Sequence, residues 1–196
     1  CVPVTALSSS YMVTTYPTML KSGIWYQSEF MVVAGPVACD VTIIPSCVTE
    51  SGVPAGTPIA VHLDPNEVYQ VQAQTGAAND LTGSTIVADN GTDEFAVFNG
   101  HIWTYLTNCG NQNADPLFEQ AYPLESWGTE HILMITIEQN DNAYRVVAKE
   151  NGTTFTVNGV PTGPVLNVGD VYDGNFSNVT EAIMIESNKP CAVTQT

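Results

Sequence analysis

Short runs of β-branched and aromatic residues, each bounded by Gly, Pro, Asn or Asp, follow one another along almost the whole chain. This pattern predicts strands joined by turns, and we find no convincing amphipathic helix. Only Leu117–Tyr122 could form one short helical turn. The expected strands are Tyr11–Tyr16, Glu29–Ala34, Asp40–Ile44, Ile59–Leu63, Val68–Ala73, Gly83–Ala88, Phe95–Asn99, Ile102–Leu106, Ile132–Glu138, Tyr144–Lys149, Thr153–Asn158, Val165–Asn167, Val171–Asn175, Ala182–Glu186 and Ala192–Gln195.

The order of these runs occurs twice, with an offset that shrinks along the chain. The corresponding segments are Pro3–Tyr11 and Pro123–His131 (offset 120), Val32–Ala34 and Val146–Ala148 (114), Val41–Ile43 and Phe155–Val157 (114), Leu63–Tyr69 and Leu166–Tyr172 (103), Ile86–Asn90 and Met184–Asn188 (98), and Ala96–Val97 and Ala192–Val193 (96). The offset changes only in predicted loops, which is how insertions alter a preserved framework.

The repeat predicts an all-β chain of two tandem modules with virtually no helix. Module one spans residues 1–100, a connector spans 101–122, and module two spans 123–196. Because neighbouring strands are joined by short turns, each module is expected to be an antiparallel β-meander. Two architectures fit this expectation, a β-sandwich-like module and a propeller-blade-like one, and composition does not decide between them.

The charge is strongly one-sided, with 4 basic and 20 acidic residues and a net charge of −16. Such a surface repels phosphate backbones, so nucleic acid is not an expected partner. The chain has no run of about 18 apolar residues, so we expect no membrane insertion. Acidity also suits solubility alone, or the binding of cations such as Ca²⁺.

One loop concentrates the acidic groups. Asp89, Asn90, Asp93 and Glu94 lie within six residues, and such closely spaced oxygen ligands suit Ca²⁺. The alternative is a solvated hairpin loop, because Asp, Asn and Gly are good turn formers. Apart from possible Ca²⁺, we expect no cofactor.

Five cysteines are present, none of them in a C-x-x-C pair, which disfavours a zinc or redox site. Cys39 and Cys47 flank a predicted strand, and we expect a disulfide between them outside the cell. The alternative is two buried or free thiols.

Aromatic residues mark a candidate ligand-binding loop. Trp25 and Tyr26 lie in a predicted hairpin beside Tyr16, and the corresponding hairpin of module two is six residues shorter. An inserted loop with aromatic side chains is suited to binding a sugar or a protein. The alternative is that Trp25 packs over a neighbouring module, and Trp103 and Trp127 are expected to fill a core or an interface.

Several short motifs recur in the modules and the connector. They are Trp127-Gly128, the strand Tyr144–Ala148, the turn Asn151–Thr154, the pattern Leu-x-x-Gly-Asp-x-Tyr at Leu166–Tyr172, Ser187–Val193, Asp80–Ser84, Phe95–Gly100 and Phe118–Gln120. Together they resemble the IgGFc-binding protein N-terminal domain family, found in mucus-associated animal proteins and in many large bacterial secreted and surface repeat proteins. The resemblance implies a repetitive, extracellular β-domain at the cell surface with adhesive or structural work, and it supplies no catalytic residues.

We therefore expect a non-enzymatic module of a secreted cell-surface protein that binds other protein modules or glycans or builds an extracellular array. No catalytic set is apparent, because His62 and His131 occupy unrelated module positions and His101 lies just after module one. One alternative is the subunit of an extracellular filament, a homo-assembly formed by β-strand addition. The other is a carbohydrate-active enzyme, since many carboxylates are present.

Overall fold

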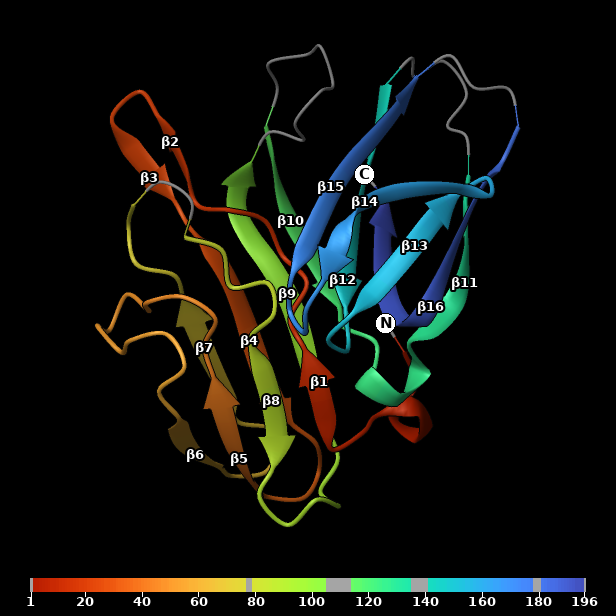
Figure 1. Ribbon diagram of the computed structural model, residues 1–196. Helices are drawn as coiled ribbons and strands as arrows, with labels where there is room; N and C mark the ends of the chain where they lie inside the picture. The colour runs from red at the N-terminus through yellow and green to blue at the C-terminus, as the bar shows by residue number, and fades with distance from the viewer. Residues whose placement is uncertain (1, 77–78, 105–113, 135–140, 178–180, 196) are drawn as a thin grey trace. The chain divides into compact units, whose positions relative to one another are not determined.

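The computed structural model describes residues 2–76, 79–104, 114–134, 141–177 and 181–195, and its regular structure is almost entirely antiparallel sheet (Figure 1). This confirms the expected all-β fold. The two short 3₁₀ turns are η1 (Val4–Ala6) and η2 (Leu124–Ser126). The strands are β1 (Ser10–Met12), β2 (Met19–Lys21), β3 (Ile24–Tyr26), β4 (Ser28–Ala34), β5 (Cys39–Ile44), β6 (Ile59–Leu63), β7 (Val68–Gln72), β8 (Thr85–Ala88), β9 (Phe95–Thr104), β10 (Asp115–Gln120), β11 (Gly128–Leu133), β12 (Asp141–Ala148), β13 (Thr153–Val157), β14 (Val160–Leu166), β15 (Val171–Ser177) and β16 (Ile183–Gln195).

The chain divides into two compact units. The first comprises Cys1–Thr104 and Asp115–Ser126, and the second is built around Trp127–Thr196. Each unit has its own cluster of buried apolar side chains.

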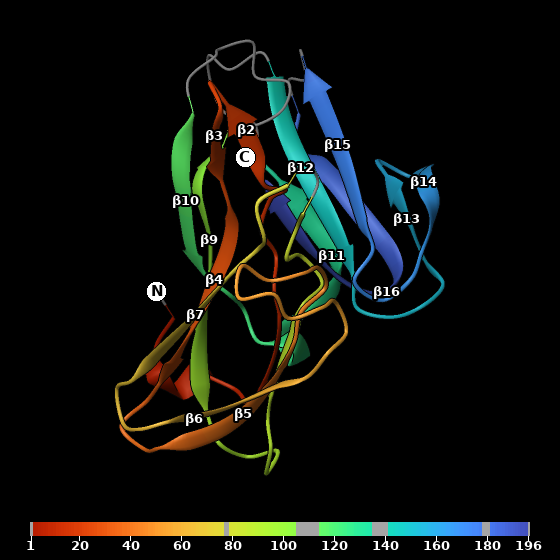
Figure 2. The ribbon, with the colours of Figure 1, turned by 90° about the vertical axis from the view of Figure 1, so that its left-hand side faces the viewer.

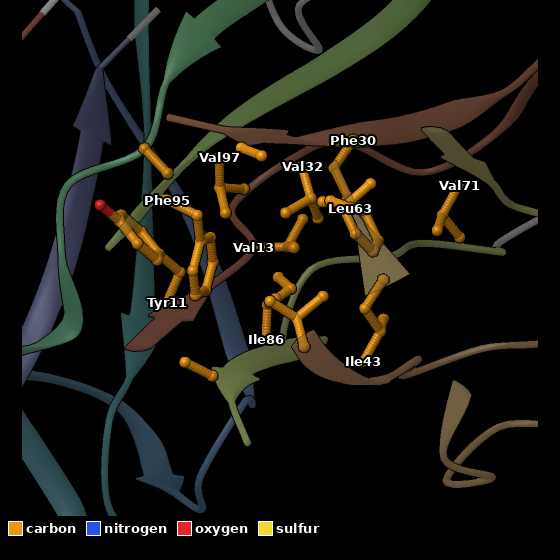
Figure 3. Packing of buried hydrophobic residues seen from close by; sticks show 14 of the residues in the cluster. Tyr11, Val13, Phe30, Val32, Ile43, Leu63, Val71, Ile86, Phe95 and Val97 are labelled. Atoms are coloured by element: carbon orange, nitrogen blue, oxygen red, sulfur yellow. The ribbon is translucent and has the colours of Figure 1, made fainter. Parts of the chain in front are cut away.

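The first unit is a β-sandwich of two four-stranded sheets, ordered β1-β8-β5-β6 and β10-β9-β4-β7. Buried and more exposed residues alternate strictly along β4, as expected for a strand with one face in a core. Figure 2 shows the ribbon of the two sheets, and Figure 3 shows Phe30 and Val32 from one sheet facing Ile43 and Ile86 from the other. Face-to-face packing of two apolar sheet faces is what holds a sandwich together. Of the two architectures that the sequence allowed, the first unit therefore has the β-sandwich.

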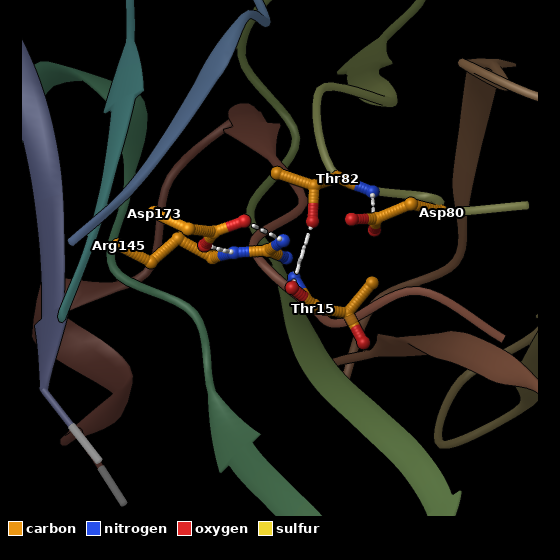
Figure 4. A network of polar contacts seen from close by, with 5 residues as sticks. All are labelled: Thr15, Asp80, Thr82, Arg145 and Asp173. Atoms are coloured by element: carbon orange, nitrogen blue, oxygen red, sulfur yellow. Dashed lines mark hydrogen bonds and ion pairs between the residues drawn. The ribbon is translucent and has the colours of Figure 1, made fainter. Parts of the chain in front are cut away.

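A buried polar contact fixes the segment that follows β1. The Thr82 hydroxyl accepts a hydrogen bond from the Thr15 backbone N–H and donates one to the Thr15 carbonyl, both at 2.9 Å. Asp80 Oδ1 in turn accepts from the Thr82 N–H at 2.8 Å (Figure 4). Both threonines are buried, so these bonds satisfy backbone groups that water does not reach.

The second unit is one curled sheet, ordered β14-β13-β16-β12-β15, with β11 also paired to β16. The long strand β16 pairs with β13 through its first residues and with β12 through its last, which lets the sheet curl over one core. Across β12 and β15, Arg145 lies opposite Asp173 and makes two hydrogen bonds to its carboxylate, from Nε at 2.7 Å and from Nη2 at 3.1 Å (Figure 4).

Both units use the same strand pairing. The order β1-β8-β5-β6 of the first unit recurs in the second as β11, the first part of β16, β13 and β14. The order β9-β4-β7 recurs as the last part of β16, β12 and β15. The registers also agree, since Val32 pairs with Tyr69 and Val146 pairs with Tyr172. The turns η1 and η2 follow Pro3 and Pro123. The duplication seen in the sequence is thus a duplication of topology.

One offset in the sequence alignment is wrong by a single residue. The alignment matched Ile86 with Met184, but Ile86 pairs with Ile43, whereas its counterpart opposite Val157 is Ile185. Ile86 and Ile185 are both fully buried and Met184 is exposed. Because side chains alternate between the two faces of a strand, a one-residue slip places every side chain on the wrong face.

A shared turn explains the Leu-x-x-Gly-Asp-x-Tyr motif. In the second unit the Asp170 carboxylate accepts a hydrogen bond from the Asn167 N–H at 2.7 Å, and in the first unit Glu67 accepts from the Asp64 N–H at 2.9 Å. The residue before each acid, Gly169 or Asn66, has a positive φ. Gly and Asn are the residues that adopt this conformation most readily.

The segment Leu117–Tyr122 does not form the helical turn that its sequence allowed. Residues 115–120 form β10, which adds to the edge of β9 with Leu117 opposite His101. Hydrogen bonds to a neighbouring strand here outweigh the weak local preference.

Candidate functional site

The predicted aromatic loop is a β-hairpin in the first unit, formed by β2 and β3 (Figures 1 and 2). Its two turn residues, Ser22 and Gly23, have φ angles of 53° and 80°. Positive φ at both central residues is typical of a type I′ turn, whose twist matches that of the flanking strands.

One face of the hairpin packs against Trp103 of β9. The rings of Tyr26 and Trp103 lie 4.6 Å apart and tilted, and Lys21 Nζ lies 4.3 Å from the centre of the Trp103 ring. A cation over an aromatic ring is attracted by the charge distribution of that ring. These contacts anchor the hairpin to β9.

Apolar side chains remain exposed on the same hairpin. Leu20 and Ile24 are 52% and 57% exposed, and Leu20 lies directly across from the half-buried Trp25. Leu20 and Trp25 share one face of the hairpin, whereas Ile24 pairs with Lys21 and lies on the other face. Single exposed apolar residues are common on protein surfaces, but several of them on one projecting element are typical of an interaction surface. We call Leu20, Ile24 and Trp25 the hairpin patch.

The three predicted ligand-binding residues do not share one environment. Trp25 and Tyr26 are half-buried on β3, whereas Tyr16 precedes β2 and is only 8% exposed. Tyr16 is therefore buried in this structure, and the hairpin patch lacks it.

The sequence places Trp103 in a core or an interface and does not by itself indicate its contact with the hairpin. The register between β4 and β9 indicates this contact. Ser28 on β4 pairs with His101 on β9, so continuing the same antiparallel register by two residues places Tyr26 opposite Trp103. The hydrogen bond from the Ile102 N–H to the Gln27 carbonyl, at 3.2 Å, agrees with that extension.

The acidic loop is held by its own side chains. Asn90 Oδ1 accepts hydrogen bonds from the Thr92 and Asp93 N–H groups, both at 2.9 Å. Asp89 Oδ1 accepts from the Thr42 hydroxyl at 2.7 Å. Within the described part of the chain, no three His, Cys, Asp or Glu side chains gather in a metal-binding arrangement. The Ca²⁺ site at Asp89, Asn90, Asp93 and Glu94 stays a prediction.

The expected Cys39–Cys47 disulfide is absent, and both residues are free thiols. Cys39 is the first residue of β5, and Cys47 lies beyond its last residue, Ile44. Between them the Ser46 N–H donates to Ser84 Oγ at 3.0 Å. A disulfide needs Cα atoms within about 7 Å, and a strand rises about 3.3 Å per residue. Burial raises the pKa of the Cys47 thiol to about 11, which makes it unreactive at neutral pH.

A cysteine and a histidine also meet in the second unit. Cys191 Sγ lies 3.5 Å from His131 Nε2 and 3.4 Å from the Ser187 hydroxyl. A nucleophilic cysteine needs a depressed pKa and access for its substrate. Burial instead raises the pKa of Cys191, whose side chain is fully buried. The arrangement is that of a core thiol.

Comparison with known proteins places the whole chain in one group. The family model described as IgGFc binding protein matches residues 1–196. No curated protein and no solved structure matches the chain. Among the described residues, no helix is long and apolar enough to cross a membrane.

Proposed function

Because the chain belongs to the IgGFc binding protein family, we propose that it is a non-enzymatic adhesive module of a secreted cell-surface protein and that the hairpin patch contacts its protein partner. Members of this family are typically extracellular proteins that bind other proteins. The assignment of the contact to β2 and β3 rests on the structure of this chain.

The single observation that carries the proposal is the exposure of Leu20 and Ile24 on a hairpin that Trp103 holds in place. When a partner removes exposed apolar side chains from water, the free energy of the complex falls by roughly 25 cal/mol per Å² of apolar surface buried. A hairpin that is already fixed also loses little conformational entropy on binding.

The proposed module has no enzymatic role. The best candidate for a catalytic pair among the described residues, Cys191 with His131, has a fully buried thiol whose pKa is raised by that burial. A binding role needs no such group, and the exposed hairpin provides a surface for it.

The experiment is a binding assay with two immobilised probes, an immunoglobulin Fc fragment and a mucin-type glycoprotein. The double variant Leu20→Ser/Ile24→Ser should weaken binding to the recognised probe about tenfold or more, which corresponds to roughly 1.4 kcal/mol. Val37→Ser is the matched control, because Val37 is 69% exposed and lies in the same unit outside the hairpin.

Unchanged binding by the double variant would contradict the proposal, as would binding to neither probe. The unfolding midpoint of each variant should equal that of the parent chain, since surface substitutions usually change stability by about 0.5 kcal/mol or less.

The filament alternative finds little support at β14, an outer strand of the second unit. Strand addition requires free N–H groups along the outer edge, and β14 contains Pro161 and Pro164. Prolines in an edge strand are a common device against edge-to-edge pairing. Sedimentation of the chain over a range of concentrations tests this alternative, which requires concentration-dependent polymers.

A further inference from the structure

A small pocket lies on the first unit where the edge strands of its two sheets meet. Its volume is about 190 Å³, and its lining combines Ile59 from β6 with Tyr69 and Val71 from β7. Thr49, Glu50 and Ser51, from the loop of residues 45–58 between β5 and β6, complete the wall. The pocket is outside the hairpin patch.

An insertion builds this pocket. In the second unit the corresponding turn between β13 and β14 is residues 158–159 alone. The longer loop of the first unit lies along the outer edge of β7, with the Glu50 N–H donating to the Gln72 carbonyl at 2.8 Å and the Gln74 N–H donating to the Val48 carbonyl at 2.9 Å. The second unit forms the same strand pairing without such a loop, so we infer that the ordered loop of the first unit serves a purpose other than folding.

The polar groups around the pocket are held in place before any ligand arrives. Thr49 Oγ1 and Ser51 Oγ are 2.9 Å apart, and Glu50 Oε2 accepts from Gln27 Nε2 and from the Thr75 N–H, each at 3.2 Å. Alternate residues of a strand direct their N–H and C=O groups to the same edge. Since the Gln72 carbonyl faces the loop, the N–H and C=O of Gln70 face the same outer edge.

These groups restrict the chemistry of the ligand. None of the four basic residues of the chain lines the pocket, which disfavours phosphate or carboxylate ligands. A purely apolar ligand would displace water from the hydroxyl and amide groups of the wall and leave their remaining hydrogen-bonding capacity unused. A volume of about 190 Å³ is below that of the pockets that hold drug-sized molecules, about 300–1,000 Å³.

We propose that this pocket binds one neutral sugar ring, with the ring's C–H face against Tyr69 and Ile59 and its hydroxyls bonded to Thr49, Ser51 and Glu50. A sugar ring presents both an apolar face and several hydroxyl groups, which matches a wall of mixed character. The site is independent of the hairpin patch, so either proposal can fail without the other.

The test is a titration of the ¹⁵N-labelled chain with methyl glycosides of glucose, galactose, mannose and N-acetylglucosamine, followed by amide chemical shifts. At least one glycoside should give saturable shifts, in the millimolar range, centred on residues 49–51 and 69–72. Ser51→Phe should abolish these shifts by filling the pocket, and Glu50→Gln should weaken the affinity several-fold. Thr92→Phe is the control for the aromatic substitution, because Thr92 is exposed on a loop that does not line the pocket.

Three results would overturn the proposal. The first is the absence of saturable shifts with every glycoside, and the second is shifts that survive in Ser51→Phe. The third is tighter binding of methylammonium or inorganic phosphate at the same residues, which would identify an ion site. The Leu20→Ser/Ile24→Ser variant should bind the glycoside like the parent chain.

Discussion

Asn99 on β9 makes two hydrogen bonds to Thr14, the second residue after β1, and the corresponding pair of the second unit, Gln195 and Met134, is also joined by two hydrogen bonds. Asn99 Oδ1 accepts from the Thr14 N–H at 3.3 Å, and Asn99 Nδ2 donates to Thr14 Oγ1 at 2.9 Å. In the second unit Gln195 Oε1 accepts from the Met134 N–H at 2.9 Å, and Gln195 Nε2 donates to the Met134 carbonyl. Each unit thus uses an amide side chain to bind the segment after its first strand, β1 or β11, to β9 or to its counterpart, the last part of β16.

Removing this amide should destabilise the first unit. Asn99 is buried, so Asn99→Ala leaves the Thr14 N–H without its partner, at a cost of about 1–3 kcal/mol. Amide hydrogen exchange of β1 and β9 in the full chain measures the change. Thr14→Val removes only the hydroxyl contact and should cost less. Equal exchange in Asn99→Ala and the parent chain would show that the bond contributes nothing.

His101 should make the first unit less stable in mild acid. Its ring is buried, Nδ1 accepts from the Trp103 N–H at 3.1 Å, and Nε2 therefore carries the proton and donates to the Pro17 carbonyl at 3.0 Å. Burial lowers the pKa of His101. A neutral buried histidine contributes stability above its unfolded pKa of about 6.5, and that stability is lost as the pH falls below this value. Urea unfolding between pH 8 and pH 5 should show a decline that His101→Gln flattens.

His62 provides a comparison of opposite sign. Its ring Nδ1 lies 2.8 Å from Asp40 Oδ1, and this hydrogen bond raises the pKa of His62. The contribution is therefore present below the unfolded pKa and disappears as the pH rises through the raised value. Because both side chains are well exposed, His62→Gln should change stability only slightly, and more at pH 6 than at pH 8. A larger effect at pH 8 would contradict this assignment.

The Arg145–Asp173 pair should stabilise the second unit. The Arg145 side chain is 3% exposed, so Asp173→Asn weakens two charge-assisted bonds to a buried guanidinium. We expect a loss of about 1–3 kcal/mol, measured by hydrogen exchange of β12 and β15. Glu181→Gln is the control, because Glu181 is exposed and its substitution removes the same charge from a chain of net charge −16. An equal effect of the two variants would mean that only the net charge matters.

Most strands could be predicted because each sheet face imposes a local pattern, but their pairing could not, since β4 and β5 follow each other in the chain and lie in different sheets. Alternating residues such as Phe30 and Val32 indicate one buried face, and turn residues mark the strand ends. The pattern could not fix the register of Ile86, because a run of consecutive apolar residues fits either face. It also could not place Leu117–Phe118 in a strand, since that strand depends on pairing with distant β9.

The candidate site was only partly predictable. The hairpin with Trp25 and Tyr26 follows from its length and composition, but its anchor Trp103 lies on another strand and requires the β4–β9 register. The free thiols Cys39 and Cys47 also could not be predicted from their spacing in the sequence. Eight residues apart, they suit a small loop, yet the strand between them is extended and keeps them separate.

Gly174 allows the Tyr144 ring to lie across β15. The two residues are paired directly, and a Cβ on Gly174 would lie 2.6 Å from Tyr144 Cε1. Gly174→Ala should therefore displace the buried Tyr144 side chain and cost about 1–3 kcal/mol, a typical penalty for overpacking. Gly128→Ala is the matched control, because a Cβ there meets nothing within 4 Å, and it should change stability by less than about 0.5 kcal/mol. Hydrogen exchange of β12 and β15 distinguishes the two variants, and equal protection in both would show that Tyr144 can move at no cost.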